Sequence, residues 1–91
     1  MPRPKQQRES EFKKRFGARV RELRKERELT QDQLAELADI SRDSIKNIEK
    51  GKHGPLFETL EKLIRGLDCE PSELFAFEMP KKSAKNRVPS H

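Results

Sequence analysis

The stretch Thr30–Gly51, TQDQLAELADISRDSIKNIEKG, has the pattern of two short amphipathic helices joined by a three-residue turn. Thr30 and Ser41 are each placed to cap a helix, because a hydroxyl oxygen can accept a hydrogen bond from an unpaired backbone N–H in the first turn. Gly51 stands where the second helix should end. The spacing therefore predicts a helix, a tight turn and a second helix.

Small and aliphatic residues define the packing faces of these two helices. Leu34, Ala35 and Ala38 fall on one face of the first helix, and Ile45 and Ile48 point inward from the second. Two such helices, packed through small residues across a short turn, form a helix-turn-helix motif. In this motif the second helix is the one that reads DNA.

The stretch resembles the Cro/C1-type (Xre-family) helix-turn-helix of phage repressors and restriction-modification controller proteins, and the resemblance covers about residues 12 to 76. It implies an all-α fold, a lambda-repressor-like domain of five helices that binds DNA as a two-fold dimer. The matching positions are Thr30-Gln31, Leu34-Ala35, Ile40-Ser41, Ser44-Ile45, Ile48-Glu49, Gly51, Arg19-Val20, Leu23-Arg24, Pro55, Leu60 and Leu67.

One position in the turn departs from the family pattern. Asp39 stands where the family usually has glycine. Aspartate tolerates the left-handed backbone region better than most residues. We therefore expect the turn to form with some strain.

The positive charge of the chain is concentrated at its ends. The net charge is +5, of which residues 1–8 carry +3 and residues 80–91 carry +4, so that residues 9–79 sum to −2. Within that part, residues 42–53 hold four basic and two acidic residues, whereas residues 56–79 hold two basic and six acidic ones. A basic edge opposite an acidic end favours an oriented approach to phosphate, although an ordinary mixed surface would give the same counts.

The composition argues against several classes of protein. No apolar run is long enough to span a membrane, and there is no signal-peptide core. The single Cys69 cannot form an internal disulfide, which fits a reducing cytoplasm. With one cysteine, two histidines and no glycine-rich phosphate loop, no nucleophile–base pair and no metal-ligand cluster is apparent. We expect no enzyme, cofactor or metal site.

The predicted organisation is a single domain between two tails. Residues 1–9 are predicted to be a disordered arm, either solvated or following the DNA backbone, and residues 80–91 a disordered basic tail. The domain spans residues 10–79, with Phe12, Phe16, Val20 and Leu23 as the apolar stripe of its first helix. The expected helices are a first helix that Ser10 caps and that runs to about Arg27, followed by helices at about Gln31–Ala38, Arg42–Lys50, Phe57–Gly66 and Ser72–Phe77.

The outward positions of the second helix of the motif are the candidate base contacts. Arg42 suits guanine through a bidentate contact, and Lys46 offers the same donors less rigidly. Asp43 can accept from cytosine or orient Arg42, and Asn47 suits adenine or a phosphate.

Further residues are candidate phosphate contacts. The resemblance implies that Gln31, in the first turn of its helix, binds a phosphate and supports the recognition helix. Asp32 would complement the helix dipole there but lie close to DNA. The other candidates are Ser44, which is alternatively a packing residue, the loop residues Lys50 and Lys52, and His53 as a weak contact.

Two further groups of residues are predicted to be structural. The resemblance implies that Arg24 pairs with Glu49, which would tie the first helix to the recognition helix. Large apolar residues near the C-terminal end of the domain are predicted to form a homodimer interface, or else to cover the base of the core. These residues are Leu74, Phe75, Phe77 and Met79.

The leading hypothesis is a cytoplasmic, sequence-specific transcriptional regulator that binds double-stranded DNA as a homodimer on an inverted repeat. The alternative is a module of the same fold that binds a protein partner, such as the antitoxin of a toxin–antitoxin pair. Basic residues at positions 42, 46, 50 and 52 favour the first hypothesis, whereas Asp43 and the low charge of the domain favour the second.

Overall fold

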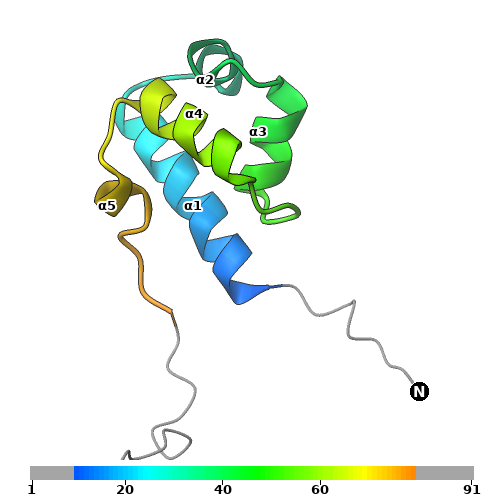
Figure 1. Cartoon of the computed structure of the whole chain (residues 1–91), viewed down its shortest axis with the longest axis vertical. Coiled ribbons are helices and arrows are strands. Elements are labelled where there is room, and N and C mark those ends of the chain that lie inside the picture. Colours follow the sequence, from blue (N-terminus) through cyan, green and yellow to red (C-terminus); the bar gives the residue numbers. More distant parts are fainter. Residues whose placement is uncertain (1–9, 80–91) are drawn as a thin grey trace, which may run out of the picture.

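The computed structural model describes residues 10–79, and the tails predicted for residues 1–9 and 80–91 lie outside them. Every regular element in the described part is a helix, as expected (Figure 1). No helix in this part is long and apolar enough to cross a membrane. The helices are α1 (Glu11–Glu26), α2 (Gln31–Ala38), α3 (Arg42–Glu49), α4 (Phe57–Leu67) and α5 (Pro71–Leu74).

The first three helices begin at hydroxyl caps that the sequence predicts. Ser10 and Ser41 each accept a hydrogen bond from the backbone N–H three residues further on, at 3.2 and 3.1 Å. Thr30 does the same for Gln33, and the Gln33 side chain accepts the Thr30 N–H in return, at 3.0 and 2.8 Å. This reciprocal pair is a capping box, which satisfies two backbone donors at the start of α2.

The turn between α2 and α3 has the left-handed residue predicted for it. Asp39 adopts φ 60° and ψ 47°, and the N–H of Ile40 then bonds to the carbonyl oxygen of Ala35 at 3.0 Å. Helix α4 ends in the same way, with Asp68 at φ 54° and ψ 52°. Both helices therefore end at an aspartate where glycine is the usual choice.

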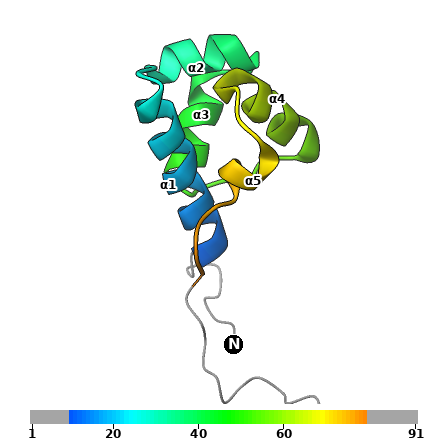
Figure 2. The ribbon, with the colours of Figure 1, turned by 90° about the vertical axis from the view of Figure 1, so that its left-hand side faces the viewer.

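The core is a single aliphatic cluster with one aromatic ring. Helix α2 packs against α3 and α4, while α1 packs against α3 and α5. Figures 1 and 2 show α3 and α5 on opposite sides of the molecule. The buried apolar residues are Phe16, Val20, Leu23, Leu34, Ala35, Ala38, Ile45, Ile48, Leu63, Leu67 and Leu74.

Two expectations about the ends of the domain are wrong. Helix α5 ends at Leu74 rather than about Phe77, and Phe12, the first residue of the predicted apolar stripe, is 48% exposed where the rest of the stripe is buried. The rings of Phe75 and Phe77 both contact the Phe12 ring, with centroids 6.2 and 5.5 Å away. Residues two apart in a helix point in nearly opposite directions, so both rings reach Phe12 only because the chain leaves the helix. Helix α4 also runs one residue beyond Gly66.

Two glycines allow close helix contacts that the sequence analysis does not identify. A Cβ atom on Gly17 of α1 would lie 2.1 Å from the carbonyl oxygen of Ile48 in α3. A Cβ atom on Gly66 of α4 would lie 2.8 Å from the Ala38 Cβ in α2. Glycine inside a helix costs about 0.5–1 kcal/mol relative to alanine. The helix-helix contacts explain why it is found at these positions.

Candidate nucleic-acid interface

Helix α3 presents its polar face to solvent because its apolar face is buried. Ile45 and Ile48 are at most 3% exposed. Arg42 and Asp43 in the first turn are exposed, and Lys46 and Asn47 in the second turn are partly exposed. The structure thus places all four candidate base contacts on the part of α3 that remains accessible.

The C-terminal end of α3 is held by a buried ion pair. Arg24 of α1 donates to both carboxylate oxygens of Glu49, from Nε at 2.7 Å and from Nη2 at 3.0 Å. The two side chains are only 9% and 4% exposed. Arg24 also donates from Nη1 to the carbonyl oxygen of Leu29 at 2.7 Å. The predicted Arg24–Glu49 pair is confirmed, and its two parallel hydrogen bonds fix the orientation of both side chains.

Gln31 joins this network from the first turn of α2. Its Nε2 donates to the Glu49 carboxylate at 3.1 Å, and the residue is partly exposed. The support for α3 that the resemblance implies is therefore present. An amide nitrogen carries two hydrogens, so one N–H of Gln31 remains to donate to a phosphate.

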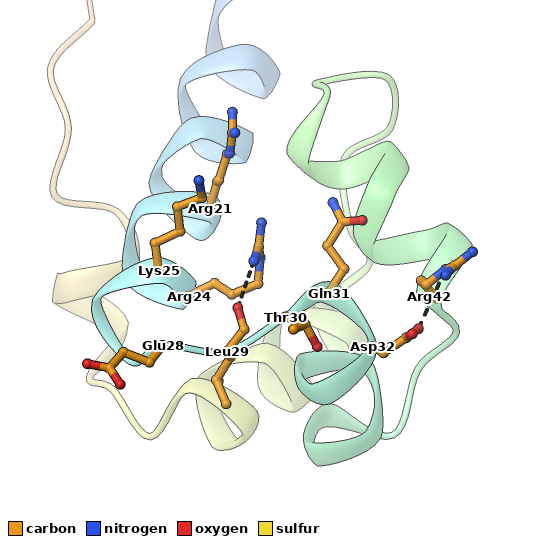
Figure 3. Close-up of a pocket in the computed structure, with 9 residues that line it drawn as sticks. All are labelled: Arg21, Arg24, Lys25, Glu28, Leu29, Thr30, Gln31, Asp32 and Arg42. Carbon is orange, nitrogen blue, oxygen red and sulfur yellow. Dashed lines mark hydrogen bonds and ion pairs between the residues drawn. The ribbon is translucent and has the colours of Figure 1, made fainter.

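An open groove of about 640 Å³ separates the C-terminal half of α1 from the first turns of α2 and α3. Figure 3 shows Arg21 and Lys25 on one side and Gln31 and Arg42 on the other. In the sequence, Arg21 and Lys25 are two of several basic residues on the exposed faces of the first helix. The helical spacing of α1 could have placed them near Arg24, but only the tertiary fold places them opposite α2.

The side chain of Arg42 has an ion-pair partner on the preceding helix. Its Nε lies 3.5 Å from Oδ1 of Asp32, and both side chains are more than half exposed (Figure 3). Asp43 is the residue that the sequence suggests for orienting Arg42. In the structure Asp32 of α2 is the partner, because the first turns of α2 and α3 come together across the turn.

A smaller hollow of about 180 Å³ lies on the side of α3 next to the α3–α4 loop. Ser44, Asn47 and His53 line it, together with Thr59 of α4. Lys50 and Lys52 are exposed at the end of α3 and in the loop. The candidate phosphate contacts therefore form two groups: Gln31 lines the groove next to α1, whereas Ser44 and His53 line the smaller hollow, with Lys50 and Lys52 exposed near the start of the loop.

The residues predicted for a dimer interface differ in accessibility. Leu74 is completely buried in the core, as the alternative role of covering the base of the core predicts, so its side chain has no surface left for another chain. Phe75 and Met79 are 38% and 39% exposed, and Phe77 is partly buried. The sequence analysis does not single out Leu56 and Phe57, which are 71% and 86% exposed.

The described residues offer little reactive chemistry. The Cys69 thiol is partly buried, and this burial raises its pKa above the usual value, although the nearby Arg27 acts in the opposite direction. A thiol with a raised pKa is mostly protonated at neutral pH and is a poor nucleophile. Among residues 10–79, no group of three or more histidine, cysteine, aspartate or glutamate side chains could hold a metal ion.

Comparisons with known proteins place these features in a family. Residues 20–74 match the family described as Helix-turn-helix. The chain is 38% identical over 68 residues to the control protein C.MunI of a Mycoplasma species, covering 74% of this chain and 92% of that protein. It is 41% identical over 58 residues to the immunity repressor of Bacillus phage phi105, covering 64% of this chain but only 40% of the repressor.

A solved structure gives the same result. The restriction-modification controller protein C.AhdI from Aeromonas hydrophila is 39% identical in sequence and superposes with a TM-score of 0.66. The match covers 68% of this chain and 94% of C.AhdI. The likeness therefore extends through almost the whole of the C.AhdI chain.

Proposed function

The chain belongs to the Cro/C1-type (Xre) helix-turn-helix family, whose members are DNA-binding transcriptional regulators, and from this we propose a sequence-specific regulator that binds an inverted-repeat operator as a homodimer. Helix α3 would enter the major groove. Such a protein would act in the cytoplasm. The observation that carries the proposal is the accessible polar face of α3, with Arg42 and Asp43 in its first turn.

The residues of this face suit base edges. Arg42 would donate to O6 and N7 of guanine, and Lys46 to the same atoms with a single charged group. Asn47 would pair with adenine, and Asp43 would accept from the amino group of cytosine. Each well-formed bidentate contact contributes about 1–3 kcal/mol of discrimination.

A helix in the major groove lies between two phosphate backbones, and the two groups of candidate phosphate contacts would serve one backbone each. This groove is about 12 Å wide and is bounded by the two sugar–phosphate backbones. Gln31 would bind one backbone, through its remaining N–H and the N-terminus of α2. The second backbone would meet the other group, which consists of Ser44, Lys50, Lys52 and His53.

Exposed apolar residues at the C-terminal end of the domain and around the start of α4 support the homodimer. A hollow of about 140 Å³, lined by Phe12, Pro55, Phe75 and neighbours, joins the C-terminal end of the domain to the loop before α4. The exposed Phe57 follows this loop, and Met79 follows the Phe75 segment. A two-fold dimer needs one self-complementary patch, and on DNA it would place two recognition helices about 34–36 Å apart.

Selection of bound duplexes from a random library, at near-physiological salt, tests the proposed function. The wild type should enrich an inverted repeat. Arg42→Ala and Lys46→Ala should each lower the affinity for it about tenfold or more, with relaxed preference at a defined base pair. Arg65→Ala, which removes an exposed positive charge from α4, is the matched control and should keep the preference.

Failure of the wild type to enrich any sequence would refute the regulator. The protein-interaction module, including an antitoxin, would then take its place, and the surface around Phe75 and Met79 would be the place to look for the partner. Enrichment that Arg42→Ala leaves unchanged would refute the assigned role of Arg42 alone.

The homodimer can be tested without DNA by sedimentation equilibrium. Phe57→Asp and Met79→Asp should each raise the dimer dissociation constant about tenfold or more, because a charge would be buried without a partner. Phe57 is 86% exposed, so its replacement should not affect folding. Leu37→Asp, at a 59% exposed position on α2, should leave the dimer intact. A monomeric wild type at micromolar concentration would contradict the homodimer.

A further inference from the structure

The ion pair between Asp32 and Arg42 puts an acidic side chain in the surface that is proposed to bind DNA, which is unusual. The Asp32 side chain is 69% exposed and the Arg42 side chain 55% exposed. The two side chains meet at the wall of the groove that the first turns of α2 and α3 form (Figure 3). A phosphate bound at the N-terminus of α2 would lie close to this carboxylate. Asp32 would therefore oppose DNA binding unless its charge is compensated.

Stability alone does not account for this pair. An ion pair this exposed contributes about 0–1 kcal/mol, because water screens both charges. Asp32 also interacts favourably with the dipole of α2, but that effect is of similar size. Asparagine in the same position would keep much of the local structure without the charge next to DNA.

The contact leaves the outer end of the Arg42 guanidinium available. Asp32 meets Nε, so both terminal nitrogens, Nη1 and Nη2, remain free to donate to O6 and N7 of one guanine. An arginine side chain has several rotatable bonds, and an ion pair at Nε favours the conformations that keep the guanidinium beside Asp32. The geometry therefore suits a charge that aims Arg42 at a base.

We propose that Asp32 is a positioning residue that increases the selectivity of base reading by Arg42. This proposal rests on the proposed function and concerns the same surface. At the correct base pair, Arg42 binds guanine while it also neutralises Asp32. At a wrong base pair, Arg42 either leaves Asp32 to bind a phosphate, or stays beside Asp32 with no acceptor on the base for its terminal N–H groups. The uncompensated carboxylate then repels the backbone, and the complex is weakened.

This arrangement predicts opposite effects on two kinds of DNA. Asp32→Asn should raise the affinity for non-cognate duplexes about fivefold, since a negative charge near the phosphates is removed. It should lower the preference for guanine at the Arg42 position by about fivefold. The ratio of specific to non-specific binding would thus fall although overall affinity is not lost.

Fluorescence anisotropy titrations with the selected operator, a single-base variant and a random duplex measure these effects. Glu36→Gln is the matched control, because Glu36 is also an exposed acid on α2. It should change neither quantity by a comparable factor. In Arg42→Ala, the further change Asp32→Asn should no longer alter the base preference, since the two residues act as a unit.

Several outcomes would overturn the proposal. If Asp32→Asn shifts the melting temperature and leaves base discrimination unchanged, the only role of Asp32 is to stabilise the N-terminus of α2. An equal effect of Glu36→Gln would show a general charge effect. A full Asp32→Asn effect in the Arg42→Ala background would show that Asp32 acts without Arg42. A wild type that selects no operator would refute the proposed function itself, and this proposal with it.

Discussion

Replacement of Glu49 by alanine should cost about 3–5 kcal/mol of folding free energy, because it leaves the Arg24 guanidinium buried without its counter-charge. Gln31 would also lose the acceptor of its side-chain amide. A loss of this size approaches the whole stability of a small domain, about 5 kcal/mol at the lower end. Urea unfolding followed by circular dichroism measures it, since the chain has no tryptophan or tyrosine.

Two comparisons show whether burial is the cause. Arg15→Ala breaks an exposed ion pair, in which the side chains of Arg15 and Glu11 are 43% and 45% exposed. It should lower the free energy of unfolding by no more than about 1 kcal/mol. Replacing both Arg24 and Glu49 by apolar residues of similar volume should be less harmful than Glu49→Ala alone. A loss below about 1 kcal/mol in Glu49→Ala would contradict this account of the pair.

The second large effect is expected for Gly17→Ala. The new Cβ would lie 2.1 Å from the carbonyl oxygen of Ile48 and 2.9 Å from that of Glu49. Alanine gains up to about 1 kcal/mol in helix propensity. The contact is with backbone atoms, so α3 must move, and overpacking of this kind costs about 1–3 kcal/mol or more. The clash should outweigh the propensity gain, and thermal unfolding should show a lower midpoint.

Gly54→Ala provides the control for this prediction. A Cβ on Gly54 would meet only the flexible side chain of Lys13, at 3.6 Å, so this substitution should be neutral or slightly stabilising. Operator binding by Gly17→Ala should also be weaker, since a displaced α3 would reach the bases less well. Gly17→Ala with unchanged stability and unchanged operator affinity would show that α1 and α3 can separate at no cost.

The features that could be predicted from the sequence depend on short-range spacing. Hydroxyl caps at Ser10, Thr30 and Ser41, the left-handed Asp39 and the buried stripe of α3 are all local patterns, and all are present. The four candidate base contacts followed from the same periodicity, because burial of two isoleucines decides which side of α3 faces water.

The features that escaped prediction depend on contacts between distant segments. The role of Gly17 appears only when α3 crosses α1, and the partner of Arg42 only when two first turns meet. The sequence predicts a helix as far as Phe77 because apolar residues continue beyond Leu74, but α5 has only four residues. The contacts of Phe75 and Phe77 with Phe12, more than sixty residues away, determine the backbone there.

The network that joins Arg24, Glu49 and Gln31 has a consequence for the DNA as well as for the protein. Because it ties α3 to both α1 and α2, the network resists tilting of α3 within the domain to follow an imperfect groove. In the proposed homodimer, the operator would have to bend or twist so that both half-sites meet two rigid helices. The stiffness of the base pairs between the half-sites then becomes part of recognition, although no side chain touches them.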